Sequence, residues 1–475
     1  MPAPTRTAPR RRRHRAALLL LAVAGAALLA AAPASARELQ QSQSVAYDAF
    51  DRSSMAGAAK GMKAGGQPDP MPGLLNPDIP LSSVNSKTAS MEDLILPHGY
   101  PLESYPVETK DGFVLRLYRI PHGVKNATQP GPRPVVMLNH GVTLASNSFA
   151  VLDPGSSMAF YLADAGFDVW LPNSRGNTYS RGNRYYRATD QGYWDNSMDE
   201  LALFDRASQI DFITNKTGQA QIAAIGHSQG CTLTVMLLAM RPDYIDKLWL
   251  FMLMGPVTHS EYIQAPFLRQ QARTESAQVM LASAGIGPFI PNTVTSNMIS
   301  GCAIPANTEY CFNLINFMFY GPSYAIQLPD FMRVGSTWPS GVAVRNLAHW
   351  SQMYHTRNGI YMYDYGENCT IDHALAKPFQ ESCNQMKYGV DTPTQYDLGR
   401  INKKLKAIVL HGELDIMATL TDVEMLRHSW NATELLFKIY PKTAHMDFVW
   451  ARDPIMKQDI INLLWQNAPK ATGSK

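Results

Sequence analysis

Along residues 104–255 of this chain, apolar residues recur with two spacings: every second residue, as in a strand, and every three to four residues, as in a helix. The stretch 104–121 alternates around Lys110-Asp111-Gly112, which predicts a β-hairpin. Short apolar runs then take turns with segments of helical spacing, and such alternation predicts a parallel sheet flanked by helices. The predicted strands are 134–141, 168–173, 222–226 and 247–255, and the predicted helices are 158–166, 199–217 and 231–240.

The alternation stops at about residue 257 and resumes after residue 400. Strand patterns return at 406–412 and 434–441, and helix patterns return at 421–430 and 453–466. The economical interpretation is one α/β core, residues 87–256 and 401–475, with an insertion of residues 257–400. We expect that insertion to form a cap at the carboxyl ends of the strands, where ligands bind in open α/β sheets.

The N-terminus differs in composition from the rest. Six arginines precede the apolar run 16–32, and Ala34-Ser35-Ala36 follows it, so residues 1–36 resemble a cleavable signal peptide. A membrane anchor is the alternative, but the run is rich in alanine and shorter than the ~20 residues that a span needs. Residues 37–86 are dense in Gly and Pro, which indicates a linker or a removable pro-segment.

Charge and hydropathy exclude two further classes of protein. The formal charge is +3, but without the six arginines 36 basic residues face 39 acidic ones. The chain without its N-terminal arginines therefore has no excess of basic residues that would indicate binding to nucleic acid. The longest other apolar run, 248–254, is too short for a membrane span and fits a central strand.

The five cysteines fit an oxidising compartment if four of them pair. Cys302 and Cys311 lie nine residues apart and Cys369 and Cys383 fourteen apart, so local pairs are expected, with Cys231 as a buried thiol. The sequence contains neither a C-x-x-C nor an H-E-x-x-H motif, so it gives no support for a metal site. Four N-glycosylation triplets predict surface loops of a secreted chain, at Asn126, Asn215, Asn368 and Asn431.

The strongest chemical signal is GHSQG at residues 226–230. Ser228 lies between a predicted strand and a predicted helix, with glycines two positions before and after it. Such a sharp turn tolerates its strained apex only when neighbouring positions lack side chains. The pattern is the nucleophile elbow of an α/β-hydrolase.

A serine nucleophile requires a histidine base and a carboxylate that orients it, and in this fold they follow in the order Ser, Asp or Glu, His. The loop after strand 406–412 offers Glu413 and Asp415, and Asp415 is preferred because it lies farther along the loop. His445 is the only histidine between the last strand and the last helix. Two other histidines could act as the base: His411 lies at the loop that offers Glu413 and Asp415, and His428 lies on a predicted helix.

The oxyanion of the reaction requires backbone N–H donors. The residue after the nucleophile, Gln229, supplies one, and Val142, in the turn after strand 134–141, is expected to supply the other. His140 precedes Gly141 in that turn and is interpreted as a structural histidine rather than a second base.

The chain resembles the acid lipases, the family of gastric and lysosomal acid lipases, from about Asn76 to Trp465. The matching motifs are HGYPLESYPVETKDGFVLRLYRIPHG, LADAGFDVWLPNSRGNTYSR, YWDNSMDELALFDRASQIDFI, KTGQAQIAAIGHSQG and AHMDFVWARD. The resemblance implies the triad Ser228, Asp415 and His445, the donors Gln229 and Val142, and a Cys302–Cys311 disulfide. Val142 replaces the family's usual leucine, and Cys369 and Cys383 have no evident family counterpart.

The resemblance implies a lipase that acts on triacylglycerols or sterol esters, and together with the apolar cap it predicts action at a lipid–water interface, without a cofactor. We expect it in the secretory pathway, either extracellular or in a lysosome or vacuole. The apolar stretch LINFMFYGPSYAIQLPDFM would form a mobile lid or a permanently buried cap core. The alternatives are an acyltransferase with the same triad and a non-catalytic lipid-binding protein on a hydrolase scaffold.

Overall fold

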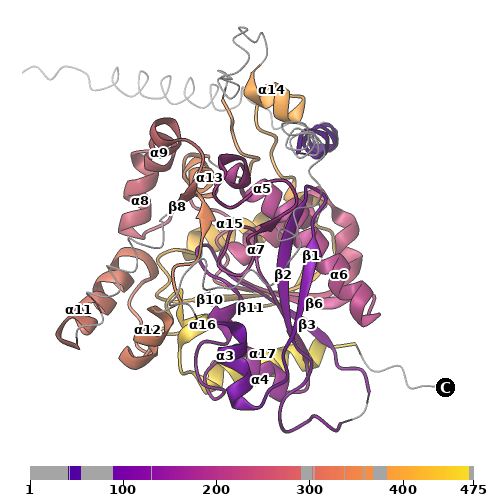
Figure 1. The fold of residues 1–475 in the computed structure, drawn as a ribbon, viewed down its shortest axis with the longest axis vertical. Coiled ribbons are helices and arrows are strands. Elements are labelled where there is room, and N and C mark those ends of the chain that lie inside the picture. Colours follow the sequence, from indigo (N-terminus) through magenta and orange to yellow (C-terminus); the bar gives the residue numbers. More distant parts are fainter. Residues whose placement is uncertain are drawn as a thin grey trace, which may run out of the picture. The chain divides into compact units, whose positions relative to one another are not determined.

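A mostly parallel sheet forms the core of the computed structural model, which describes residues 41, 43–54, 89–129, 131–289, 302, 305–335, 337–356, 359–366 and 382–469. Its strand order is β1-β2-β4-β3-β6-β7-β10-β11, and β5 pairs with β2 (Figure 1). The pairs β1–β2 and β2–β4 are antiparallel, whereas β4 to β11 run parallel. The strands are β1 (Glu103–Glu108), β2 (Phe113–Ile120), β3 (Val135–Asn139), β4 (Asp168–Pro172), β5 (Gly182–Asn183), β6 (Ile222–His227), β7 (Leu248–Met254), β10 (Lys406–Gly412) and β11 (Thr433–Tyr440).

The central strands explain why the sequence shows continuous apolar runs. Every residue of β3, β4, β6 and β7 is buried, as expected for parallel strands that are covered on both faces. The predicted hairpin is also confirmed, with Gly112 at φ 85° in its turn. The predicted α/β-hydrolase fold class is therefore confirmed.

Helices cover both faces because the chain reverses direction within the sheet. From β3 it moves to β4 on one side, and then to β6, β7, β10 and β11 on the other. Right-handed crossovers place the first connecting helix, α4, on the face opposite to the later ones. The helices before β7 and after α14 are α3 (Met91–Ile95), η2 (Leu96–His98), η3 (Ser146–Phe149), α4 (Met158–Asp164), η4 (Gln191–Trp194), α5 (Met198–Glu200), η5 (Leu201–Arg206), α6 (Ala207–Thr217), α7 (Gln229–Met240), η6 (Pro242–Lys247), η8 (Leu398–Arg400), α15 (Leu420–Ser429), α16 (Asp447–Trp450) and α17 (Pro454–Asn467).

The segment between β7 and β10 is built mainly from short helices. Helices α8, α9, α11 and α12 group together beside the sheet (Figure 1). A short antiparallel pair, β8–β9, precedes α13. The elements are α8 (Pro266–Arg273), α9 (Ser276–Ala284), β8 (Pro288–Phe289), α11 (Pro305–Ile315), η7 (Asn316–Tyr320), α12 (Leu328–Gly335), β9 (Val342–Ala343), α13 (Val344–His355) and α14 (Cys383–Tyr388). We call this segment, residues 257–400, the cap.

One part of the predicted linker is ordered. Residues 43–54 form a helix whose Ala46 and Phe50 are fully buried in the main core. Phe50 stacks on Phe204 of η5 and packs against Tyr388 of α14. The sequence analysis did not predict this helix, because its apolar pattern consists of only two buried residues on one face, four positions apart. The predicted signal peptide, 1–36, lies outside the described residues.

Candidate active site

Ser228 lies at a strained turn between β6 and α7. Its φ and ψ are 55° and −124°, a conformation that residues other than glycine rarely adopt. Its backbone N–H donates to the carbonyl of Met254, 3.2 Å away. A Cβ at Gly226 would lie 2.7 Å from the Cys231 nitrogen, and one at Gly230 would overlap the Asn139 carbonyl. The two glycines are thus required by the close packing of this turn.

His445 and Asp415 form a direct hydrogen bond in the loops that follow β11 and β10. His445 Nδ1 lies 2.7 Å from Asp415 Oδ2, and both side chains are buried. The other carboxylate oxygen, Oδ1, accepts the backbone N–H groups of Met417 and Ala418 at 2.9 and 2.8 Å. Because the carboxylate accepts at Nδ1, this nitrogen carries the proton and Nε2 is left as the basic nitrogen.

The elbow and the histidine loop are joined by His227, which sequence reasoning did not select. Its Nε2 lies 3.0 Å from the carbonyl oxygen of His445 and must donate to it, and the two rings are 4.7 Å apart. Burial lowers the pKa of His227 well below its usual value, so this imidazole stays neutral. Among the described residues, no hydrogen bond joins the Ser228 hydroxyl to His445; such bonds often tighten only when substrate binds.

The rival residues point elsewhere. Glu413 is exposed and accepts the backbone N–H of Lys442, and His428 is exposed on α15. His140 contacts the Gly141 carbonyl through Nδ1, and its Nε2 accepts the N–H of Ser174. Burial lowers the pKa of His140 to about 4. His411 is a buried residue of β10.

The two expected oxyanion donors flank Ser228. Gln229 is the first residue of α7, so its backbone N–H has no partner within the helix. Val142 follows Gly141, at which a Cβ would lie 3.0 Å from the Cβ of Ser228. The turn after β3 therefore lies directly against Ser228. Thr143, next in this turn, has a φ of 56°.

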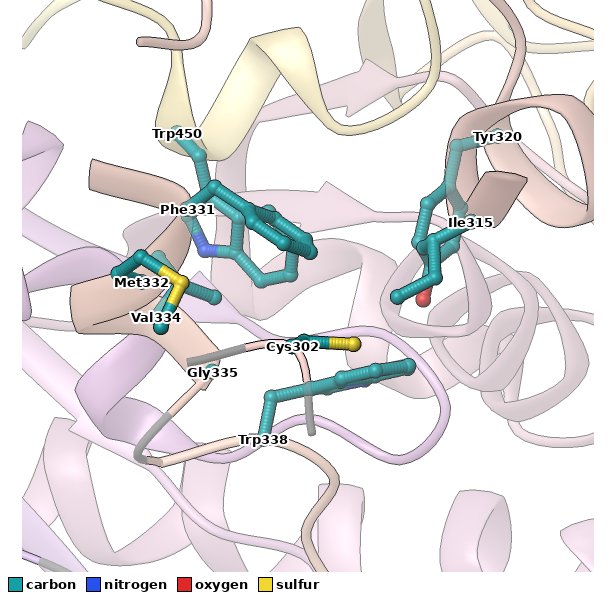
Figure 2. A pocket seen from close by; sticks show the side chains of 9 residues that line it. All are labelled: Cys302, Ile315, Tyr320, Phe331, Met332, Val334, Gly335, Trp338 and Trp450. Carbon is teal, nitrogen blue, oxygen red and sulfur yellow. The ribbon is translucent and has the colours of Figure 1, made fainter. Parts of the chain in front are cut away.

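An apolar pocket lies beside the loop of His445, the candidate base. It lies between α11, η7 and α12 of the cap and α16 of the core. Figure 2 shows Phe331 and Trp450 facing Ile315 and Tyr320 across it. Tyr320 also accepts the backbone N–H of His445 through its carbonyl at 3.1 Å. The full lining is Cys302, Ile315, Tyr320, Phe331, Met332, Val334, Gly335, Trp338 and Trp450.

A buried ion cluster joins the segment after β4 to the hairpin turn and to η5. Arg175 follows β4 and is 3% exposed. Its guanidinium pairs with Asp111 of the hairpin turn at 2.6 Å and with Asp205 of η5 at 2.6 Å. Three segments that are distant in sequence are thereby held together. The motif NSRG owes its arginine to this contact.

The cysteines fall into two groups. Cys302 and Cys311 form a disulfide, and Cys231 is a buried free thiol. Burial raises the pKa of Cys231, so it remains protonated. Cys383 is buried at the start of α14, and its predicted partner Cys369 lies outside the described residues, so that pairing stays a prediction.

The glycosylation triplets differ in exposure. Asn126 is 3% exposed and its amide donates to the carbonyls of Ala163 and Asp164, which argues against a glycan there. Asn215 is exposed on α6 rather than in a loop, and Asn431 is exposed after α15. Asn368 lies outside the described residues. Glycosylation at Asn215, Asn368 and Asn431 stays a prediction.

Comparisons with known proteins agree with this architecture. A family model described as the partial α/β-hydrolase lipase region matches residues 91–153, and one for the α/β hydrolase fold matches residues 134–273. Gastric triacylglycerol lipase of Rattus norvegicus is 34% identical over 80% of this chain and 91% of its own. Lysosomal acid lipase/cholesteryl ester hydrolase of Homo sapiens is 31% identical over 81% and 93%. The chain therefore belongs to the acid lipase family, a group of carboxylic ester hydrolases with the α/β-hydrolase fold.

Proposed function

We propose that this protein is a lipase that hydrolyses neutral lipid esters, triacylglycerols or sterol esters, with Ser228 as nucleophile. In the acylation step His445 Nε2 removes the hydroxyl proton while Ser228 Oγ attacks the ester carbonyl. Asp415 stabilises the imidazolium through Nδ1–H. The proton then passes to the leaving alcohol, and the acyl group stays on Ser228.

Deacylation repeats these steps with water. His445 removes a proton from a water molecule, the hydroxide attacks the acyl carbonyl, and the proton returns to Ser228 Oγ as the fatty acid leaves. In both tetrahedral intermediates the backbone N–H groups of Gln229 and Val142 are the proposed donors to the oxyanion. No step requires a cofactor.

The observation that carries this proposal is the buried 2.7 Å hydrogen bond between His445 and Asp415. His227, which precedes the strained Ser228, links that loop to the elbow through the His445 carbonyl and supports the proposal. The apolar pocket beside His445 supports lipid esters as substrates, since an acyl chain gains free energy by leaving water for such a cavity. The relatives' names point to the same chemistry: one acts on triacylglycerol and another on cholesteryl esters.

A place in the secretory pathway, extracellular or in a lysosome or vacuole, fits the relatives and the N-terminal sequence. A disulfide within the cap supports an oxidising compartment. Of the helices in the described part of the chain, none is long and apolar enough to cross a membrane.

The test combines active-site labelling with lipid assays. A fluorophosphonate should label the wild type and leave Ser228→Ala unlabelled. The wild type should release fatty acid from triacylglycerol emulsions or cholesteryl ester dispersions, and added alcohol should not divert most of the acyl groups into new esters. An unlabelled wild type, or a labelled Ser228→Ala variant, would refute the nucleophile; predominant ester exchange would indicate an acyltransferase.

A further inference from the structure

Two tryptophans of the cap donate hydrogen bonds to the two sides of the proposed oxyanion hole. Trp350 Nε1, on α13, donates to Gln229 Oε1 at 2.7 Å. Trp338 Nε1, just after α12, donates to Thr143 Oγ1 at 3.3 Å. Gln229 carries one proposed donor N–H, and Thr143 follows directly after the residue that carries the other. The cap therefore contacts the hole at both of its walls.

A main-chain contact reinforces the second wall. The backbone N–H of Ser340 donates to the Thr143 carbonyl at 2.7 Å. The Ser340 hydroxyl in turn accepts the backbone N–H of Thr178 at 2.8 Å, which attaches this part of the cap to the core. Thr143 has a positive φ of 56°, which a β-branched residue maintains only when surrounding contacts hold it there. These cap contacts are suited to fix the turn.

We propose that Trp350, assisted by Trp338, is a positioning residue that holds the oxyanion hole in its reactive geometry. This inference rests on the proposed function. Oxyanion donors accelerate the reaction because they are already aligned before charge develops, so any freedom of Gln229 or of the turn lowers the rate. Neither tryptophan touches the reacting atoms in this scheme; each acts through the residue it anchors.

A structural consequence follows for substrate entry. Moving residues 338–350 away from the core would break both indole hydrogen bonds and the Ser340 contact. The proposal therefore requires residues 338–350 to be in place when the oxyanion forms on the substrate.

The decisive variant is Trp350→Phe, which keeps an aromatic side chain but removes the N–H donor together with part of the indole ring. We expect kcat on a water-soluble p-nitrophenyl ester to fall about tenfold, the equivalent of one hydrogen bond, with KM unchanged. The inhibition constant of a trifluoromethyl ketone, which forms an oxyanion on Ser228, should rise by the same factor. Trp338→Phe should act in the same direction, less strongly because its hydrogen bond is longer.

The matched control is Trp465→Phe on α17. Its indole N–H donates to the Ala165 carbonyl at 3.1 Å, remote from the site. This variant loses the same chemical group and should keep kcat, KM and inhibitor affinity. Unchanged kcat in Trp350→Phe, or a rise in KM alone, would overturn the inference while leaving the lipase proposal intact.

A double-mutant cycle tests the pairing from the core side. Gln229→Met removes the acceptor while keeping the side-chain length, and it should lower kcat to about the level of Trp350→Phe. The double variant should be no slower than either single variant, because both break one contact. Additive losses would contradict the proposed pair. If Trp350→Phe does not fold, Gln229→Met and Trp338→Phe still decide the question by the same kcat and inhibitor measurements.

Discussion

The core and the cap achieve order by different means. In the core, whole strands are buried, and the buried guanidinium of Arg175 is paired with two carboxylates. In the cap, short helices leave large apolar side chains in water, among them Tyr310 and Phe317, which are 70% and 64% exposed. The core is thus stabilised by its own burial, whereas much of the cap depends on contacts with the core.

The active site lies where these two regions meet. The proposed triad comes from the core, but Tyr320, Trp338 and Trp350 of the cap contact its histidine loop and its oxyanion turn. A site divided in this way can have chemistry that is encoded in the core and geometry that depends on the cap. The variants below separate the two contributions.

The largest effect is expected from Asp415→Asn. The amide cannot orient the Nδ1–H tautomer of His445, so kcat should fall roughly 10³- to 10⁴-fold with little change in thermal stability. Steady-state hydrolysis of a soluble ester and a thermal melt check this prediction. Glu413→Gln, two residues away on the exposed side of the loop, is the control; an equal loss there would reassign the triad acid.

Arg175→Met should destabilise the core by about 3–5 kcal/mol. The variant leaves the buried carboxylates of Asp111 and Asp205 without their cation. Urea unfolding measures the change. In the control Arg184→Met an exposed pair with Glu108 is lost, which should cost less than about 1 kcal/mol. Similar losses in the free energy of unfolding for both variants would show that burial does not determine how much the cluster stabilises the core.

Phe50→Ala tests the helix of residues 43–54, which touches both regions. The ring lies between Phe204 of the core and Tyr388 of the cap, and removing it should cost about 3 kcal/mol in the free energy of unfolding. Val45→Ala on the same helix, at a position 45% exposed, should be nearly neutral. A negligible loss for Phe50→Ala would mean that this helix is not part of the stable fold.

The smallest expected effect is on the pH dependence of the free energy of unfolding, and it involves Asp447, which contacts the cap. Asp447 accepts the Ala444 N–H at 2.7 Å and a hydrogen bond from Ser323 of the cap. Burial raises the pKa of Asp447 to about 6, so the folded state binds its proton more tightly than the unfolded chain. The stability from this group is present below about pH 4 and is lost as pH rises through 6, on the order of 2 kcal/mol.

Asp447→Asn should therefore remove that decline. Its free energy of unfolding, relative to the wild type, should increase between pH 4 and pH 6, whatever its offset at pH 4. Denaturant titrations at several pH values provide the measurement, and the exposed Asp246→Asn is the control. Parallel curves for Asp447→Asn and wild type would contradict the assigned group.

The sequence predicted the core well because its signals are local. Burial on both faces gives β6 and β7 continuous apolar runs, and the elbow around Ser228 imposes its own glycines. The order of Ser228, Asp415 and His445 along the chain then narrowed the search to a few loop residues. In contrast, the sequence placed residues 43–54 in a linker, because the partners of Phe50 lie far away in the chain.

By itself, the sequence determined the fold class and pointed to the candidate catalytic residues, since strand periodicity and tight turns are constraints between near neighbours. Only the tertiary structure decided what holds those residues in place. Arg175 between two distant carboxylates, His227 on the carbonyl of His445, and the tryptophans beside the oxyanion turn are contacts across large sequence separations. No local pattern records them, because they exist only after the chain has packed.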